Sequence, residues 1–506
     1  MILLAALLVQ SGGSITVDLG ERRAISKTIY GVNFPDWAKM NVPFTVARQG
    51  GNRLTAYNWE TNASNAGADW HNQNDDLMGK TDEAGWAVRS FLQPVQAHGA
   101  AAILTVPTAG YVAADKKGDG DVNQTPDYLK VRFFKSYAHK PGGHYVYPPD
   151  KTDRAVYQDE FVAWVEKIKS PKTPVWFMLD NEPDIWAGTH SRIVTKPMTY
   201  AGIIANNIEY ATAIKSVAPK ALVFGPANYG WNGFRTFQGA PDANGRDFLD
   251  VYLSAMKAAA SQAGKRLLDS LDVHWYPEAQ GGGVRIVTEN DKPGTAEARI
   301  QAPRSLWDPT YVETSWITQN LGGKPIVLLP RIEKQIADHY PGTKFSISEY
   351  NYGGNKVISG ALAEADVLGL FGRYGLFAAC IWGLDPGDKG MMAGFNAFLD
   401  YDGHDGHFGD VGLGVSGETP ADDSVYAAVD SKDRSKLTLV VINKTDAPRR
   451  MRIALKGGRA VSGRAFTATS STLPSLRPSR VNVSNGRLSL DAPAESVTTI
   501  VARLAG

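Results

Sequence analysis

The chain has 506 residues, of which 43% are hydrophobic, so it is long enough for one large domain and a smaller one. Its formal net charge is only +1, which gives no electrostatic basis for binding nucleic acid or an anionic membrane surface. The single cysteine, Cys380, excludes an internal disulfide and a cysteine-rich metal site. Its apolar surroundings predict a buried, inert thiol.

The chain begins with an apolar stretch, MILLAALLVQSGG, that has the hydrophobic centre of a secretion signal but no basic residue ahead of it. We expect residues 1–12 to be the remnant of an export signal and the protein to be secreted, the alternative being an artificial chain end. No later stretch approaches the roughly 18 consecutive apolar residues that a membrane-spanning helix needs.

Eight short apolar runs, each ending in polar or glycine-rich residues, divide residues 29–414. The runs are IYGVNF (29–34), FTVARQGG (44–51), AAILTVP (101–107), VWFMLDNEP (175–183), ALVFGPANYG (221–230), LDVHWYP (271–277), FSISEYNYG (345–353) and ACIWGL (379–384). Amphipathic segments of helical length precede the third, fourth, fifth, sixth and eighth runs. This alternation predicts a (β/α)8 barrel with long loop insertions. A doubly wound sheet fits less well, because no glycine-rich phosphate turn follows an early strand.

From about residue 415 to 506 the chain contains only short β-rich segments separated by turn residues, which predicts a small antiparallel β-sandwich. The segment SITVDLG (14–20), within residues 1–28, is expected to add a strand, so that the sandwich is built from both chain ends. No linker separates the two parts, and we expect them to pack rigidly. The sandwich has too few aromatic residues for a sugar-binding platform, so a structural role is expected.

Catalytic residues of such barrels lie at the carboxyl ends of the strands. The polar and aromatic candidates at these ends are Arg48, Asn52, Asn181, Glu182, Asn228, His274, Tyr276, Glu349 and Trp382. Two of them, Glu182 on strand four and Glu349 on strand seven, can face each other across the barrel mouth. Cleavage of a glycosidic bond requires such a pair, one carboxyl group to protonate the departing oxygen and one to attack carbon or activate water. The sequence therefore predicts a glycosidase.

Four tryptophans near strand ends, Trp59, Trp186, Trp231 and Trp382, are candidate platforms for sugar rings, with core packing as the alternative. For His274, a direct sugar contact and a role in orienting its neighbours are equally compatible with the sequence. The loop DKKGDGD places Asp115, Asp119 and Asp121 at the spacing of calcium ligands, but it lacks the glutamate of an EF-hand, and a solvated loop is the alternative. A two-carboxylate mechanism requires no cofactor, and a structural Ca²⁺ is compatible with the sequence. The segment LDYDGHDGHFGD (399–410) could bind calcium or zinc, with a substrate-side loop as the alternative.

Four separated motifs, in order, carry a family resemblance. RQGGNRLTAYNWETNASNAGADW (48–70), LDNEPDIWAGTHSRI (179–193), DVHWYPE (272–278) and ISEYNYGG (347–354) resemble glycoside hydrolase family 44. This resemblance implies a secreted bacterial endo-glycosidase acting on β-1,4-glucans of the plant cell wall, including xyloglucan. It also implies a retaining mechanism with Glu182 as acid/base and Glu349 as nucleophile. On physical grounds, we expect Arg48 and Tyr276 to keep Glu349 ionised through hydrogen bonds. We expect a monomer.

Two residues depart from the family pattern and leave the substrate preference open. Gln49 stands where family members usually have tryptophan, and Asp184 stands where a small residue is common. Neither is one of the two glutamates. The alternatives are a xylanase or another barrel β-glycosidase of the same clan and, from another class, a non-catalytic polysaccharide-binding protein.

Overall fold

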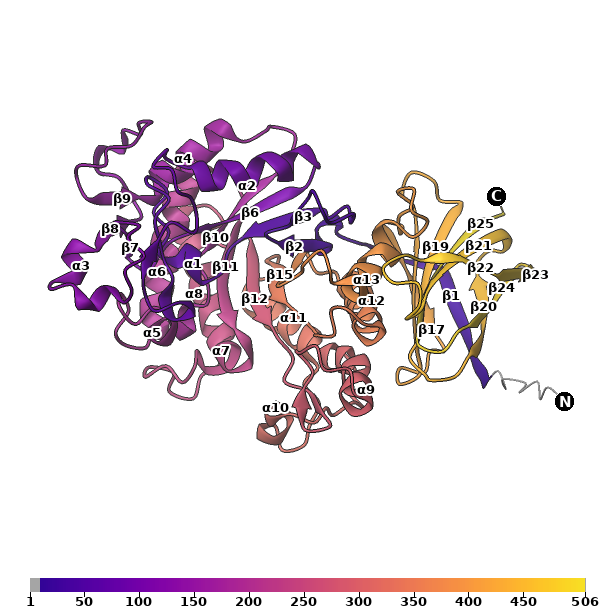
Figure 1. Cartoon of the computed structure of the whole chain (residues 1–506). Coiled ribbons are helices and arrows are strands. Elements are labelled where there is room, and N and C mark those ends of the chain that lie inside the picture. Colours follow the sequence, from indigo (N-terminus) through magenta and orange to yellow (C-terminus); the bar gives the residue numbers. More distant parts are fainter. Residues whose placement is uncertain (1–9, 506) are drawn as a thin grey trace.

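The computed structural model describes residues 10–505 and consists of a barrel and a second β-domain lying side by side (Figure 1). Most of the expected export-signal remnant falls outside the described residues. Within residues 10–505, no helix combines the length and the apolar character needed to cross a membrane.

Eight parallel strands close into the barrel in the order of the sequence. They are β2 (Gly31–Asn33), β3 (Val46–Gln49), β6 (Ala101–Val106), β10 (Val175–Leu179), β11 (Val223–Tyr229), β12 (Ser270–Trp275), β15 (Lys344–Tyr350) and β16 (Ala378–Ile381). Every residue of β6 and β10 is buried, because the barrel interior covers one face and the helices cover the other. All eight predicted runs form these strands, and the prediction of a (β/α)8 barrel is confirmed.

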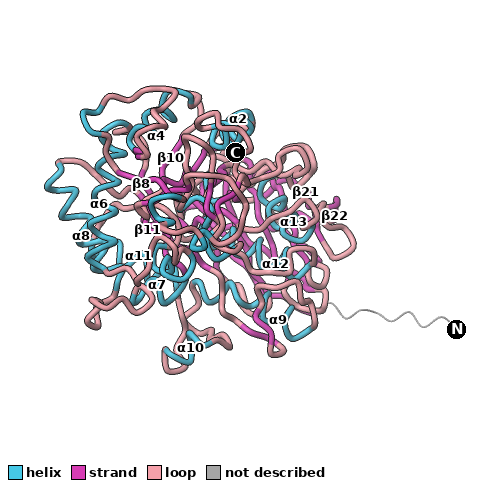
Figure 2. The backbone as a smooth tube through the Cα atoms, turned by 60° about the vertical axis from the view of Figure 1, so that its left-hand side comes forward, coloured by secondary structure: helices cyan, strands magenta, loops and turns pink. Residues whose placement is uncertain are grey.

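The helices surround the strands on the outside of the barrel (Figure 2). The long ones are α2 (Trp86–Ala97), α4 (Gln158–Ile168), α6 (Tyr200–Val217), α8 (Phe248–Ala263), α11 (Leu328–His339) and α12 (Ile358–Arg373). Five of them are the predicted segments. The sequence pattern does not reveal α11, because Pro330 interrupts it, although proline is tolerated in the first turn of a helix. Local signals fix the ends of α8, where Asp247 caps the first turn and Gly264 (φ 62°) ends the helix in the left-handed conformation.

Shorter elements extend the loops. They are α1 (Asn52–Thr55), α3 (Tyr128–Val131), α5 (Trp186–Thr189), α7 (Gly230–Thr236), α9 (Pro293–Gln301), α10 (Trp316–Asn320), α13 (Lys389–Leu399), β4 (Ser64–Asn65), β5 (Asn74–Asp75), β7 (Tyr111–Ala113), β8 (Phe133–Tyr137), β9 (Ala155–Tyr157), β13 (Gln280–Gly281) and β14 (Val284–Arg285). Each follows the carboxyl end of a barrel strand. The long insertions therefore belong to the loops that carry the active site in barrel enzymes.

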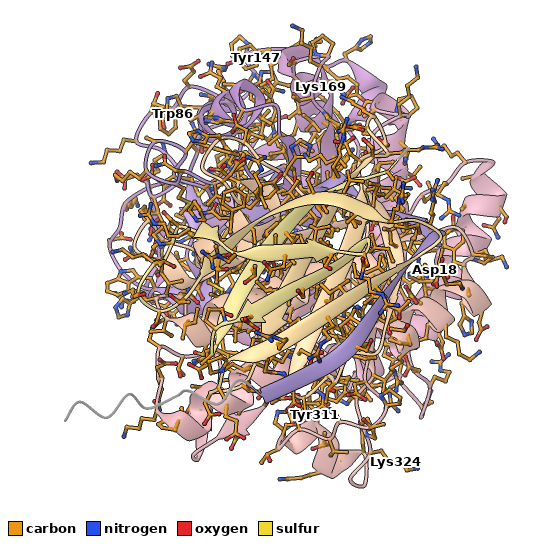
Figure 3. The ribbon with its side chains drawn as sticks, turned by 90° about the vertical axis from the view of Figure 1, so that its right-hand side faces the viewer. Asp18, Trp86, Tyr147, Lys169, Tyr311 and Lys324 are labelled. Atoms are coloured by element: carbon orange, nitrogen blue, oxygen red, sulfur yellow. The ribbon has the colours of Figure 1, made fainter. Side chains whose placement is uncertain are left out.

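The second domain is a ten-stranded sheet whose two ends approach each other through β21 and β23. Its strands are β1 (Gln10–Ala24), β17 (Val411–Ser416), β18 (Asp423–Val429), β19 (Lys436–Asn443), β20 (Arg449–Lys456), β21 (Ala460–Ala468), β22 (Arg477–Ser479), β23 (Val481–Ser484), β24 (Arg487–Ala492) and β25 (Ser496–Leu504). Figure 3 faces this domain, with the indigo β1 among the yellow strands. The domain is built from both chain ends, as predicted. It is not purely antiparallel: β1 runs antiparallel to β17 but parallel to β20, a pairing that no hairpin constrains because β1 comes from the other chain end.

Helix α12 lies between the two domains and is buried from Ile358 to Gly372. Gly369 faces the ring of Tyr426, and a Cβ atom there would stand 2.3 Å from the ring, so only glycine permits this close approach. Beside it, Lys444 Nζ lies 2.7 Å from Asp366 Oδ2 with both side chains almost fully buried, and the Tyr426 hydroxyl donates to Asp366 Oδ1 at 2.6 Å. A buried, fully paired charge thus joins the two domains.

We expect Lys444→Met to lower the free energy of unfolding by about 3–5 kcal/mol, because it leaves the buried Asp366 carboxylate without its partner. Scanning calorimetry measures the effect as a lower transition temperature. The control is Lys456→Met, which removes an exposed ion pair with Asp18 and is expected to leave the transition unchanged. Equal losses of stability in the two variants would contradict a special contribution of the buried Lys444–Asp366 ion pair.

Candidate active site

Glu349 is the penultimate residue of β15 and is held from two sides at the barrel mouth. Arg48 Nη1 donates to its Oε1 at 2.6 Å, and the Tyr276 hydroxyl donates to its Oε2 at 2.9 Å. The side chain is 6% exposed and that of Arg48 is fully buried, so the pair is shielded from solvent. A buried guanidinium stabilises the ionised carboxylate and orients it.

Glu182 lies on a strained turn directly after β10. Asp180 and Glu182 both have left-handed backbone conformations, with φ of 65° and 45°. The buried Asp180 carboxylate holds the turn, since it accepts hydrogen bonds from the Thr55 hydroxyl (2.6 Å), from the Asn181 amide (2.8 Å) and from the Thr108 amide. Such conformations are costly and persist only where surrounding contacts determine them. The turn thereby fixes the position of the Glu182 side chain.

The surroundings of Glu182 favour its protonated form. The residue is 7% exposed, and burial raises the pKa of its carboxyl group to about 8. Its Oε1 lies 2.8 Å from Nδ1 of His274, a ring that is itself fully buried. Burial lowers the pKa of His274 to about 3, so the imidazole is neutral. The charge of Arg48 acts against the protonation of Glu182, but the effect of burial is larger.

Asn181 directly precedes Glu182, shares the guanidinium of Arg48 with Glu349 and is fixed at both ends of its amide. Its Oδ1 accepts from Arg48 Nη2 at 2.8 Å and from the Gly51 amide at 3.2 Å, and its Nδ2 donates to Asn52 Oδ1 at 3.3 Å. Asn52 in turn donates to Asp69. The structure thus joins predicted residues from strands two and four in one hydrogen-bonded network.

Glu182, His274 and Glu349 form a cluster in which one ligand-type atom of each residue lies within 4.8 Å of the others. Within residues 10–505 this is the one group whose spacing also suits a metal ion. Arg48 already neutralises Glu349, however, and the two carboxyl groups differ sharply in their partners. Two carboxyl groups at this separation, one bound to a guanidinium and one protonated, suit glycosidic bond cleavage.

Comparison with known proteins agrees with this geometry. Residues 63–279 match the sequence profile of glycoside hydrolase family 44. Endoglucanase A of Paenibacillus lautus is 39% identical to this chain, over 95% of the chain and 71% of its own length. The chain belongs to glycoside hydrolase family 44.

Solved structures of family 44 enzymes share both domains. An endoglucanase from Clostridium thermocellum has a TM-score of 0.91 at 36% identity, over 97% of this chain and 99% of its own. A Paenibacillus polymyxa xyloglucanase, whose structure was solved with xyloglucan, has a TM-score of 0.91 at 34% identity, over 98% and 100% of the two chains. This family 44 chain is therefore a glycoside hydrolase, and the alternative of a non-catalytic binding protein is excluded.

Three of the four tryptophans predicted as sugar platforms in this family 44 enzyme are buried. Trp59 is 1% exposed and stacks on Trp164, and Trp231 is 5% exposed and packs beside Arg331. Trp186, also 1% exposed, donates its indole N–H to the backbone carbonyl of Asn181. The prediction was wrong for these three, because the loop segments fold back and turn their apolar residues into the core. Trp186 still contributes by supporting the turn that carries Glu182.

Trp382 alone among the four is partly exposed, and it borders a groove of about 530 Å³. Phe34 meets its ring edge to face with centroids 6.3 Å apart, and Trp86 also lines the groove. Gly51 (φ 86°) permits this arrangement, since a Cβ atom there would stand 2.4 Å from the indole. Gln49 borders the same groove, so this departure from the family pattern lies where substrate is expected.

Asn228 lies near the end of β11, Asp184 follows the neighbouring strand β10, and the two side chains differ in their hydrogen-bond partners. Asp184 accepts hydrogen bonds from the Tyr229 amide (3.0 Å) and from Gln238 (3.1 Å), so it joins two loops and has a structural role. The amide of Asn228 is fully buried, and neither of its polar atoms has a partner within residues 10–505. A buried amide in this state is a candidate partner for a substrate hydroxyl.

The acidic loop considered for calcium is occupied by arginines. Arg132 donates to Asp115 at 2.7 Å and to Asp119 at 2.7 Å, and Arg192 donates to Asp121 at 2.6 Å. Since guanidinium groups neutralise these carboxylates, the loop does not offer the free oxygen ligands that calcium requires. These contacts favour the alternative of a loop without bound calcium.

Sequence reasoning missed several residues of the site. Asn33 ends β2, accepts from Arg48 Nη1 at 3.1 Å and thereby orients the guanidinium. Its position at the end of a barrel strand could have been used to predict it from the sequence. Asp180 was interpreted only as the end of a strand. Asp272 and Ser348 lie within strands, in the barrel interior below the mouth, where nothing in the sequence distinguishes them from structural polar residues.

Proposed function

We propose that this enzyme is a retaining endo-β-1,4-glucanase in which Glu349 is the nucleophile and Glu182 the acid/base. The main support is that these carboxyl groups have oxygens within 4.8 Å of each other but opposite environments. Glu349 binds a guanidinium and a phenol, whereas Glu182 is buried against a neutral imidazole. Separations near 5 Å are typical of retaining enzymes, and inverting enzymes need room for a water.

In the first step, ionised Glu349 attacks the anomeric carbon while Glu182 transfers its proton to the departing glycosidic oxygen. Arg48 and Tyr276 hold Glu349 in line and leave it free to form the bond. The amide of Asn181 is positioned to hydrogen-bond the 2-hydroxyl of the reacting sugar, a contact that strengthens in the transition state. The products of this step are a glycosyl–Glu349 ester and ionised Glu182.

In the second step, Glu182 acts as the base. It removes a proton from a water molecule, whose oxygen attacks the anomeric carbon and displaces Glu349. Two displacements at the same carbon return the original anomeric configuration. Glu182 then holds a proton again, and Glu349 is ionised for the next cycle.

The groove and the relatives support a proposal for the substrate class. The groove beside Trp382 offers aromatic rings to sugar faces, and the relatives include an endoglucanase and a xyloglucanase. We propose β-1,4-glucans of the plant cell wall as substrates, with xyloglucan prominent. Because such polymers do not enter cells, we also propose that the enzyme acts outside the cell, as a monomer and without a cofactor.

Proton NMR during the first minutes of xyloglucan hydrolysis tests this proposal. A retaining enzyme yields the β-anomer first, and the α-anomer appears only later through mutarotation. Parallel assays on carboxymethylcellulose, xylan and mannan test the substrate class. An α-anomer formed first would overturn the mechanism, and activity confined to xylan or mannan would overturn only the substrate.

A further inference from the structure

A chain of buried hydrogen-bonding groups extends from Glu182 into the barrel interior. Nδ1 of His274 lies 2.8 Å from Glu182 Oε1, and its Nε2 lies 3.2 Å from the hydroxyl of Ser348. That hydroxyl lies 2.6 Å from Oδ2 of Asp272. Asp272 and His274 are fully buried, and Ser348 is 1% exposed. The chain thus connects two carboxyl groups through one imidazole and one hydroxyl.

Asp272 is an unusual residue for the interior of a barrel, which branched apolar side chains normally fill. Burying a carboxyl group is costly unless it is paired or protonated. Within residues 10–505, its carboxylate oxygens contact the hydroxyls of Ser346 (2.7 Å) and Ser348 (2.6 Å) and form no ion pair. The pKa of Asp272 is raised to about 7, chiefly by burial. Asp272 therefore gains or loses a proton near neutral pH, as Glu182 does.

The chain permits two arrangements of hydrogens. In the first, Asp272 is protonated and donates to Ser348, and Ser348 donates to Nε2 of His274. The hydrogen on Nδ1 then donates to Glu182 Oε1. The proton of Glu182 itself must lie on Oε2, which forms no hydrogen bond within residues 10–505 and is free to face the substrate.

In the second arrangement Asp272 is ionised and accepts from Ser348. The hydroxyl oxygen of Ser348 then accepts from the Nε2 hydrogen of His274, so Nδ1 has none. Nδ1 accepts the proton of Glu182 through Oε1. That proton is held by the imidazole and is not available to the glycosidic oxygen.

We propose that Asp272 is a positioning residue that, through Ser348 and His274, determines whether the proton of Glu182 points to the substrate. This inference rests on the proposed role of Glu182 as acid/base. Conversion of the first arrangement into the second releases one proton to solvent. Asp272 transfers its proton to Ser348, Ser348 transfers its own hydrogen to Nε2 of His274, and Nδ1 transfers its hydrogen to Glu182 Oε1. The proton on Glu182 Oε2 then leaves to solvent. No oxidant or co-reactant is required.

Other charged or titratable groups surround this chain and contribute to its pH dependence. Glu349 Oε2 lies 3.5 Å from Nδ1 of His274, and Tyr276 binds the same carboxylate. The positive charge of Arg48 lowers the pKa of both Asp272 and His274. Cys380 on β16 is a buried thiol whose pKa is raised by burial and, in part, by the charge of Asp272. None of these groups links Asp272 to Glu182.

The first test measures the tautomer of His274 in wild-type protein with ¹⁵N-labelled histidine, its signal assigned by its absence in His274→Gln. We expect the hydrogen on Nδ1 at low pH and on Nε2 once Asp272 has ionised, near pH 7. The control Ser346→Ala removes a contact of Asp272 that is not part of the hydrogen-bonded path to Glu182. We expect this variant to keep the change of the His274 tautomer with pH. A tautomer that does not change with pH would overturn the proposal.

The second test uses Asp272→Asn, whose amide N–H donates permanently to Ser348 and imposes the first arrangement. We expect kcat/KM at low pH to stay within about threefold of wild type. The alkaline decline of kcat/KM should move from about pH 7 toward about pH 8, where Glu182 alone titrates. In a Ser348→Ala background the same substitution should cause no shift, because the chain is broken. An unshifted decline in Asp272→Asn would overturn the proposal.

Failure of this inference is distinguishable from failure of the proposed function. The tautomer is measured without substrate and reports only on the proton chain. Retention of near wild-type turnover in Glu182→Gln would instead overturn the acid/base role of Glu182.

Discussion

Glu349→Gln is expected to lower kcat/KM by a factor on the order of 10⁵–10⁶, the loss seen when a covalent nucleophile is removed. The amide keeps the size and most hydrogen bonds of the carboxylate but cannot attack the anomeric carbon. It also leaves the buried guanidinium of Arg48 without a counter-charge, so the active site loses its ionic pair as well. Initial rates on xyloglucan, with the transition temperature as a check of folding, measure the effect.

Glu278, two residues after Tyr276, provides a matched control. Glu278 forms an ion pair with Arg285 at 2.9 Å and forms no hydrogen bond or ion pair with Glu182 or Glu349. We expect Glu278→Gln to stay within about twofold of wild type. Inactivation by a 2-deoxy-2-fluoro glucoside, followed by peptide mass spectrometry, should label Glu349. A label elsewhere would contradict its role as nucleophile.

The barrel and the two glutamates were predictable from the sequence because both depend on local patterns. A buried parallel strand appears as a continuous apolar run, and a barrel strand exposes its polar residues where it ends. Glu182 and Glu349 follow such runs directly, so their meeting at one rim follows from strand order alone. The same reasoning found Arg48, Asn181, His274 and Tyr276.

The tryptophans were not predictable in this way, because they lie in loops whose paths the sequence pattern does not determine. Trp186 is only four residues from Glu182, yet a tight helical turn rotates it into the core. Asp272 was not predictable for a different reason. It lies inside an apolar strand, where alternation alone indicates only that it faces inward, and its partners Ser346 and Ser348 come from a strand more than 70 residues away.

Glu182→Gln is expected to lower kcat/KM on xyloglucan by about 10²–10⁴-fold, the usual contribution of general acid catalysis. A dinitrophenyl cellobioside needs no protonation of its leaving group, so its first step should be almost unaffected by the substitution. The defect should therefore depend on the leaving group, and Glu349→Gln should show no such dependence. Equal losses on the two substrates would contradict the role of Glu182 as acid.

The pH profile gives an independent test of the same role. Since burial raises the pKa of Glu182 to about 8, the acid is protonated at neutral pH and loses its proton as the pH rises. Wild-type activity on xyloglucan should therefore be lost by the time the pH has passed about 8. Cleavage of the dinitrophenyl substrate by Glu182→Gln should lack this decline, because glutamine does not titrate. A decline that persists unchanged in the variant would assign the titration to another group, and it would remove the main electrostatic argument that Glu182, rather than Glu349, donates the proton.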